Sequence, residues 1–267
     1  MKKQLAGISI ASALLLGGCG AGDLPFIKKD EKSQEETSSP NKKDEEKGKT
    51  DERTSIPASS YNEIQEAGGK KVIQNAENIL VLVNKEYTLP RDYTPSDLVK
   101  PEVRFSFGES DEEKSFLRKP AAKALEEMFR AADADGIELY AVSGYRSFNR
   151  QELLFQTEID QVGREKARQS VAYPGTSEHQ TGLTMDIASQ STDLLLTEGF
   201  ESVPEGRWLT ENAFKFGFIL RYPKGREHVT GYQYEPWHFR YVGRETAALI
   251  HDRNYTLEEF FKMGKKI

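Results

Sequence analysis

Residues 177–186 read Ser-Glu-His-Gln-Thr-Gly-Leu-Thr-Met-Asp, and the rest of the chain is organised around them. They contain a histidine, His179, and a carboxylate, Asp186. Gly182 lies between the two and permits a tight turn, because glycine adopts positive φ without a steric penalty. A short strand is predicted over residues 184–188. We therefore expect His179 and Asp186 to face one cleft, from a loop and from the strand that follows it.

A second cluster, Glu235-Pro-Trp-His238, lies further along the chain. His238 is expected on a neighbouring strand. Pro236 interrupts regular strand geometry, so that Glu235 can lie beside the same cleft. Two imidazoles and one carboxylate form a donor set of catalytic zinc sites, which keep a fourth position open for water. The alternative is a structural role for each histidine, which is the commoner fate of a lone histidine.

Outside these clusters, the apolar pattern mixes helices and strands without a regular strand–helix repeat. This mixture predicts an α+β domain with a mainly antiparallel sheet. The predicted helices are residues 62–75, 120–135, 148–162, 166–171, 207–216, 244–251 and 256–263. The predicted strands are residues 79–83, 137–142, 184–188, 218–221 and 237–242. Residues 89–99, 143–147, 173–176 and 222–231 are predicted to be loops.

The N-terminus has the features of a secretory leader. Lys2 and Lys3 precede an apolar stretch, residues 5–16, that is too short to span a bilayer as a permanent helix. The sequence Leu16-Gly-Gly-Cys19 follows and resembles the lipobox of bacterial lipoproteins, in which a peptidase cuts before the cysteine and lipid is attached to it. Lipid on Cys19 would anchor the protein to the outer face of the cell membrane, towards the wall. The alternative is an ordinary cleaved signal peptide with an incidental cysteine.

Composition narrows the remaining possibilities. Residues 28–55 contain no aliphatic or aromatic side chain and are predicted to be disordered. We expect a lipoprotein signal peptide at 1–18, a lipidated cysteine and charged tether at 19–60, and a folded domain at 61–267. The net charge is −6, and the 43 acidic residues argue against a nucleic-acid partner. A single cysteine excludes an internal disulfide and a thiolate-rich metal site.

Three motifs together resemble those of one enzyme family. They are residues 143–147 (Ser-Gly-Tyr-Arg-Ser), 177–186 and 235–243 (Glu-Pro-Trp-His-Phe-Arg-Tyr-Val-Gly). In this order they resemble the VanY-type D-alanyl-D-alanine carboxypeptidases, a group that includes the LdcB L,D-carboxypeptidases. The resemblance covers residues 73–261. It implies the Hedgehog/DD-peptidase fold, an antiparallel sheet flanked by helices around a zinc site, and peptidoglycan stem peptides as substrate.

The resemblance also implies roles for individual residues. His179, Asp186 and His238 correspond to the zinc ligands, and Glu235 to the catalytic base. Substrate-binding positions are those of Arg146, Gln151 and Ser177. Apart from the resemblance, Tyr145 and Trp237 are expected to shape the substrate pocket, and the alternative is that they belong to the core, as aromatic residues beside strands more often do. Arg146 suits a free C-terminus, because a guanidinium binds a carboxylate with two parallel hydrogen bonds. Thr184 departs from the family pattern, which has a small apolar residue there.

Several alternatives remain open. Ser143 and Ser147 have no base at the spacing of a serine triad, which argues against serine catalysis. A peptidoglycan endopeptidase of the same fold would have no terminal carboxylate for Arg146 to bind. A non-catalytic wall-binding lipoprotein would have no use for Glu235 beside a metal. Removal of D-alanine from a tetrapeptide (L,D) is favoured over removal from a pentapeptide (D,D).

Overall fold

The computed structural model describes residues 55–267, except for the side chains of residues 169 and 170. The predicted signal peptide, Cys19 and all but the last residues of the predicted tether lie outside this range. No helix within the described range is long and apolar enough to cross a membrane. The α-helices are α1 (Lys119–Ala134), α2 (Phe148–Val162), α3 (Arg164–Ser170), α4 (Pro204–Asn212), α5 (Glu227–Thr230), α6 (Arg244–Arg253) and α7 (Leu257–Met263).

The strands form one central sheet and three small ones. The central sheet has the order β7-β8-β10-β9, and each neighbouring pair is antiparallel, as predicted. Its members are β7 (Tyr140–Ser143), β8 (Thr184–Ala188), β9 (Phe218–Leu220) and β10 (His238–Tyr241). The small sheets pair β2 (Ile64–Ala67) with β3 (Lys70–Ile73) and β4 (Tyr87–Thr88), β5 (Leu98–Val99) with β6 (Leu117–Arg118), and β1 (Ser55–Ile56) with β11 (Lys265–Lys266).

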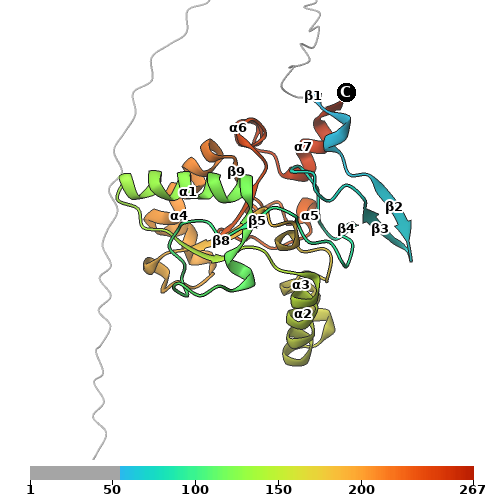
Figure 1. Ribbon diagram of the computed structural model, residues 1–267, viewed down its shortest axis with the longest axis horizontal. Coiled ribbons are helices and arrows are strands. Elements are labelled where there is room, and N and C mark those ends of the chain that lie inside the picture. The colour runs from blue at the N-terminus through green and yellow to red at the C-terminus, as the bar shows by residue number, and fades with distance from the viewer. Residues whose placement is uncertain (1–54) are drawn as a thin grey trace, which may run out of the picture. The chain divides into compact units, whose positions relative to one another are not determined.

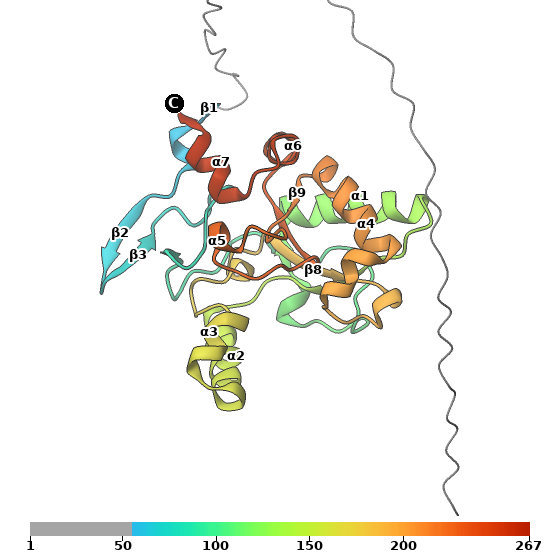
Figure 2. The ribbon, with the colours of Figure 1, turned by 180° about the vertical axis from the view of Figure 1, so that it is seen from behind.

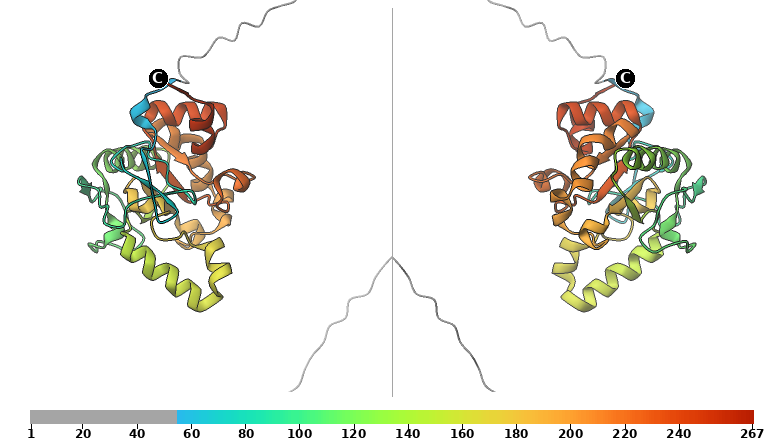
Figure 3. Two further views of the ribbon diagram at one scale, coloured as in Figure 1. Left: turned by 90° about the vertical axis from the view of Figure 1, so that its right-hand side faces the viewer. Right: turned by 90° about the vertical axis from the view of Figure 1, so that its left-hand side faces the viewer.

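Helices flank the central sheet and supply its core. The apolar face predicted for α1 is buried, with Leu125 and Met128 both fully covered. These side chains pack in one cluster with Met185 of β8 and Phe239 of β10. A smaller cluster lies between α6 and α7. Figures 1, 2 and 3 show α2 and α3 projecting together from the central sheet, at the end opposite α6 and α7. The fold is therefore a mixture of helices and sheets.

The helix predicted over residues 62–75 is wrong, because this segment is a β-hairpin. Strands β2 and β3 pair in register from Ala67 opposite Lys70. Gly68 and Gly69 form the two-residue turn with φ of 58° and 75°. Two successive residues at positive φ favour the hairpin turn that matches strand twist, and glycine supplies them at little cost. The Gly-Gly pair was the sequence signal for a turn.

The strand predicted over residues 79–83 is also wrong, although Val81 and Val83 are fully buried. Side chains, not a neighbouring strand, bind this backbone. Arg240 Nη2 donates to the carbonyls of Ile79 and Val81 at 3.0 and 2.8 Å. Asn62 donates to the carbonyl of Leu82 at 2.7 Å and accepts from its N–H at 3.0 Å. Buried apolar residues alone therefore did not distinguish a strand from an irregular segment.

The other elements lie close to their predicted ranges. Helix α2 has the predicted bounds, and β8 covers the predicted strand. Strand β7 begins at Tyr140, three residues later than predicted, because Gly136 and Ile137 still close the end of α1. The loop predicted over residues 222–231 contains the short helix α5. These differences leave the sheet that carries the site unchanged.

Candidate metal centre

Three adjacent strands of the central sheet meet at the site. Asp186 of β8 lies directly opposite His238 of β10. On its other side Asp186 pairs with Ser143 of β7, after a register shift between Ala141 and Ser143. A shift of this kind bends a strand and redirects its side chains. Segments that are far apart in the sequence are thus joined by sheet pairing, as the two motifs predicted.

His179 reaches the site from the loop before β8. It belongs to the 3-10 helix η4 (Glu178–Thr181), which ends at Gly182 with φ of 64°. The positive φ favours glycine at this position, and a Cβ here would lie 2.9 Å from Leu98 Cδ2, so that the leucine side chain would have to move. The Nδ1 atom of His179 lies 2.7 Å from the carbonyl oxygen of Gly144. This hydrogen bond fixes the ring and leaves Nε2 directed at Asp186.

The predicted ligands converge. One ligand atom from each of His179, Asp186 and His238 lies within 4.8 Å of the other two, and all three residues are buried. His179 Nε2 is 3.3 Å from Asp186 Oδ2, and His238 Nδ1 is 3.1 Å from Asp186 Oδ1. Asp186 Oδ1 is buried, and among the described residues it has an ion-pair contact with His238 but no hydrogen bond of suitable geometry. A buried carboxylate oxygen without a hydrogen bond is costly, and a cation between these donors would satisfy it. The donor set therefore fits zinc.

Glu235 lies beside His238 through a turn. The N–H of His238 donates to the carbonyl of Glu235 at 3.1 Å, with Pro236 inside the turn. Proline suits this position because its ring fixes φ near the required value. The Glu235 carboxylate lies 3.4 Å from His238 Nδ1, and its side chain is 25% exposed. The interruption of the strand at Pro236 is thus confirmed, and Glu235 reaches both the ligands and solvent.

The charges in the pocket set the protonation of its members. Burial lowers the pKa of His179 to about 3, so the ring is neutral and can donate a lone pair. Burial opposes protonation of His238 too, but the carboxylates of Asp186 and Glu178 outweigh it and raise its pKa to about 9. Burial raises the pKa of Glu235 to about 7. The carboxylates that stabilise a proton on His238 would equally stabilise a metal cation, which would in turn lower the pKa of Glu235.

Arg146 is partly exposed, whereas the three ligands are buried. Its Nη1 donates to Gln151 Oε1 at 2.9 Å and its Nη2 to Ser143 Oγ at 3.2 Å. Its backbone N–H donates to the carbonyl of His179 at 3.1 Å. Gln151 is itself held, because its Nε2 donates to the carbonyl of Ala172 at 2.7 Å. The guanidinium is therefore positioned by neutral partners and keeps its charge for another group.

The other three predicted substrate-binding residues differ in their surroundings. Tyr145 lines a cavity of about 430 Å³ together with Arg146 and Ser143, and its hydroxyl donates to Thr94 at 3.3 Å. Ser177 is buried immediately before η4. Trp237 is partly buried and packs against the main hydrophobic core. Tyr145 thus lies beside Arg146, whereas substrate contact by Ser177 and Trp237 stays a prediction.

A buried ion network, which the sequence patterns did not predict, lies behind the ligands. Glu178 accepts from Arg221 Nε at 2.8 Å and from Arg240 Nη1 at 2.7 Å. Its second oxygen lies 3.6 Å from His238 Nε2, beyond hydrogen-bond length. Burial opposes ionisation of Glu178, but the two arginines outweigh it and hold its pKa far below the usual range. Glu178 is thus an ionised carboxylate that faces Nε2 of His238, the ring nitrogen that does not contact Asp186.

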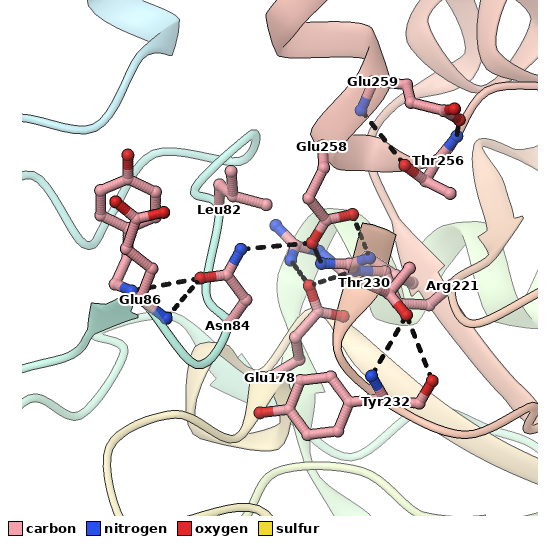
Figure 4. A network of polar contacts seen from close by, with 12 residues as sticks. Leu82, Asn84, Glu86, Glu178, Arg221, Thr230, Tyr232, Thr256, Glu258 and Glu259 are labelled. Carbon is pink, nitrogen blue, oxygen red and sulfur yellow. Dashed lines mark hydrogen bonds and ion pairs between the residues drawn. The ribbon is translucent and has the colours of Figure 1, made fainter. Parts of the chain in front are cut away.

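The network continues to the C-terminal helix. Arg221 donates to both carboxylate oxygens of Glu258, at 2.9 and 2.6 Å, and Figure 4 shows this chain of contacts from Glu178 to α7. Glu258 lies in the first turn of α7, which Thr256 and Glu259 close with a capping box. The helix end that holds the network is therefore itself fixed.

A sequence signal for this network existed. Arg240 falls inside the strand predicted over residues 237–242, and a charged residue that is buried in a sheet requires a partner. Glu178 stands within the quoted motif, next to His179. Thr184, which departs from the family pattern, donates through its hydroxyl to Glu178 Oε2 at 3.5 Å. The departure thus adds a weak contact to the network and leaves the ligands in place.

Comparison with known proteins identifies similar chains. The family described as VanY, D-alanyl-D-alanine carboxypeptidase, matches residues 114–244. YodJ of Bacillus subtilis (strain 168), which carries the name of a carboxypeptidase, is 48% identical over the full length of both chains. The matched region contains all three motifs and every ligand of the candidate metal centre.

Two solved structures are also similar. An LdcB LD-carboxypeptidase is 53% identical, covers 80% of this chain and 100% of its own, and superposes with a TM-score of 0.78. A variant of the vancomycin-resistance D,D-pentapeptidase VanY, in complex with Zn(II), is 34% identical, covers 68% of this chain and 98% of its own, and has a TM-score of 0.55. The Zn(II) in the second structure agrees with the donor set of His179, Asp186 and His238.

Proposed function

The chain belongs to the VanY family of carboxypeptidases, and on this premise we propose that it removes the C-terminal D-alanine from peptidoglycan stem peptides in a zinc-dependent reaction. The observation that carries the proposal is the meeting of three buried metal donors with a carboxylate and an arginine that both remain partly exposed. A carboxypeptidase needs these parts: a Lewis acid, a base and a cation for the terminal carboxylate.

His179, Asp186 and His238 would hold the zinc. When bound, zinc supplies Lewis acidity, which acidifies a water molecule and polarises the scissile carbonyl. Glu235 would accept the proton from the attacking water. As the carbon–oxygen bond forms and the carbon–nitrogen bond breaks, Glu235 would return that proton to the amine of the departing D-alanine. The position of Glu235, beside a ligand and open to solvent, supports both transfers.

Arg146 would bind the terminal carboxylate of the substrate. A guanidinium has five N–H donors, and the contacts to Gln151 and Ser143 use only two of them. Burial lowers the pKa of the Arg146 guanidinium, and the nearby carboxylates of Asp186 and Glu235 oppose this shift. This arrangement favours hydrolysis of the last peptide bond over an internal one, where no carboxylate would meet the arginine.

We favour L,D-carboxypeptidase activity on tetrapeptides over D,D-activity on pentapeptides. The support is the degree of likeness, since identity and TM-score are 53% and 0.78 for the LdcB enzyme against 34% and 0.55 for the D,D-pentapeptidase. We also propose that the antiparallel sheet and its flanking helices form the Hedgehog/DD-peptidase fold, which a structural alignment of β7, β8, β10 and β9 with members of that fold would test.

The experiment is a side-by-side assay of purified protein with muropeptide tetrapeptide and pentapeptide, in the presence of zinc. Mass spectrometry would identify the products, and the rate of D-alanine release would be measured for each. We expect faster release from the tetrapeptide. Faster release from the pentapeptide would assign D,D-activity, cleavage within the peptide would indicate an endopeptidase, and the absence of any product would contradict the proposal.

We further propose that lipid on Cys19 anchors the enzyme outside the cell membrane, facing its substrate in the wall. The residues between Cys19 and β1 would then let the domain reach beyond the membrane surface. Metabolic labelling with palmitate tests this: the label should enter the wild-type protein and be absent from Cys19→Ala. Equal labelling of both proteins would contradict the anchor and would leave the enzymatic proposal untouched.

A further inference from the structure

A cavity of about 680 Å³ lies beside the loop that leads into the metal centre. Lys70, at the end of the β2–β3 turn, and Lys85, before β4, line it. Arg168 of α3 lines it too, together with Tyr173 and Thr176, which precede the motif at residues 177–186. Figure 1 shows the β2–β3 hairpin and the α2–α3 pair as separate projections from the central sheet, and the cavity has residues from both.

The cavity is positively charged. Lys71 and Glu86, which also line it, form an ion pair with each other. Among the described residues Lys70 and Lys85 contact no carboxylate. Their ammonium groups lie over aromatic rings instead, Lys70 at 4.7 Å from the ring centre of Tyr173 and Lys85 at 5.0 Å from that of Tyr232. This excess of cations stands in a chain whose net charge is −6.

The aromatic contacts position the ammonium groups without neutralising them. A cation over a ring is attracted by the ring quadrupole and keeps its full charge. An ammonium has three N–H donors, and a ring contact leaves donors free for a carboxylate. Arg168 pairs weakly with Glu165 at 3.9 Å, and both side chains are mostly exposed. The three cations therefore line one cavity and keep N–H donors free for an anionic group that enters it.

A continuous set of side chains joins the cavity to the metal centre. The ammonium of Lys85 lies over Tyr232, Tyr232 contacts Tyr222 with ring centres 4.8 Å apart, and Tyr222 contacts His238 at 4.7 Å. Three steps of 5.0 Å or less place this ammonium within about 15 Å of the His238 ring. An extended peptide spans about 3.3–3.6 Å per residue, so a peptide of roughly four residues would span the distance from the Lys85 ammonium to the His238 ring.

A second connection leads to Arg146. Ala172 lines the cavity, and its carbonyl accepts the hydrogen bond from Gln151, the residue that also binds Arg146. The hydroxyl of Tyr232 donates to the carbonyl of Thr176 at 2.9 Å. The loop of residues 172–176 thus separates the arginine proposed for the terminal carboxylate from the cationic cavity. A peptide whose end lies at Arg146 would have to pass this loop to enter the cavity.

We propose that this cavity binds a carboxylate located inside the substrate peptide, upstream of the bond that is cut. The proposal rests on the proposed function and extends it to a second recognition point. Arg146 selects a free C-terminus. Lys85, with Lys70 and Arg168 lining the same cavity, selects a peptide with an additional negative charge up to about four residues away. An acidic peptide substrate is thereby preferred over an uncharged peptide that ends in the same D-alanine.

The test uses two synthetic stem peptides of one sequence, each ending in D-alanine. In one the internal carboxylates are free, and in the other they are amidated. We expect kcat/KM of the wild-type enzyme to be about tenfold higher for the free-carboxylate peptide. Higher salt should reduce this ratio, because exposed charges are screened. The triple variant Lys70→Gln, Lys85→Gln, Arg168→Gln should lower the ratio to about one.

The control is a triple variant with the same charge change elsewhere. Lys119→Gln, Lys123→Gln and Arg130→Gln alter exposed residues of α1, none of which lines the cavity. This variant should keep the wild-type ratio. The inference would be overturned by equal kcat/KM values for the two peptides in the wild type, or by an unchanged ratio in the cavity variant.

The same peptides distinguish a failure of the proposed reaction from a failure of the carboxylate site. If the wild type releases D-alanine from neither peptide, the proposed reaction is wrong, and the cavity is then tested by calorimetric binding of the same two peptides. Tighter binding of the free-carboxylate peptide to the wild type, lost in the cavity variant and kept in the control, would support the carboxylate site. Equal binding of the two peptides would exclude it.

Discussion

The inner and outer sides of the metal centre use the same residue types, arginine and carboxylate, in opposite ways. On the inner side Glu178, Arg221 and Arg240 are at most 1% exposed, and both arginines bind Glu178. On the outer side Arg146 and Glu235 are partly exposed and are held by neutral groups or by His238. Charged side chains that are buried and paired with each other hold the surrounding residues in place. Charged side chains without an oppositely charged hydrogen-bond partner remain available to bind a substrate or a proton.

The largest effect is expected from the outer carboxylate. Glu235→Ala removes the proposed proton carrier and leaves the three donors unchanged, so kcat should fall about 10³-fold while one zinc per chain is retained. D-alanine release from a tetrapeptide measures kcat, and atomic absorption measures the zinc content. Turnover near that of the wild type would place the base elsewhere.

The outer arginine comes next. Arg146→Ala removes the proposed partner of the terminal carboxylate, and kcat/KM should fall about 10²-fold. A peptide with an amidated C-terminus should lose a similar factor with the wild-type enzyme and little more with the variant, because both changes remove one interaction. Independent, multiplicative losses would show that Arg146 does not bind that carboxylate. Arg130→Ala on α1 is the control for an exposed arginine.

On the inner side a smaller and different effect is expected. Glu178→Gln removes the negative charge that faces His238 Nε2, and the zinc dissociation constant should rise about tenfold in a chelator competition. Arg221 and Arg240 would then be buried without their shared counter-charge, so the free energy of unfolding should also decrease. Unchanged zinc affinity with lower stability would limit Glu178 to a structural role.

The smallest effect is expected at the far end of the inner network. Thr256→Ala removes the N-cap of α7, and the free energy of unfolding should fall by about 1 kcal/mol. Zinc affinity should stay within twofold of the wild-type value, because Glu258 keeps its two contacts to Arg221. A tenfold loss of zinc affinity would show that α7 also positions the metal ligands.

Local patterns predicted the parts of the fold that depend on neighbouring residues. The turn at Gly182, the apolar face of α1 and the bounds of α2 and β8 are all present. The spacing of His179 and Asp186, with the proline-interrupted cluster at His238, located the donor set. Each of these elements and clusters is encoded within a few consecutive residues, so one sequence was sufficient to predict it.

The features that the sequence did not predict depend on contacts between residues far apart in the chain. Residues 79–83 are as apolar as a strand, but Arg240 and Asn62 from distant segments bind their backbone. The inner network joins Glu178, Arg221 and Glu258 from three separate elements. The cationic cavity combines the β2–β3 turn with α3. None of these partners can be assigned from spacing, because each depends on how the elements pack.

If His179, Asp186 and His238 hold a catalytic zinc, D-alanine release must depend on zinc. The protein would be stripped with a chelator, titrated with zinc and assayed on a muropeptide tetrapeptide at each step, with His238→Ala in parallel. The rate should rise in proportion to bound zinc, level off at one zinc per chain, and stay at background in the variant. A full rate in the stripped protein, or recovery of His238→Ala by zinc, would contradict a catalytic metal at these three residues.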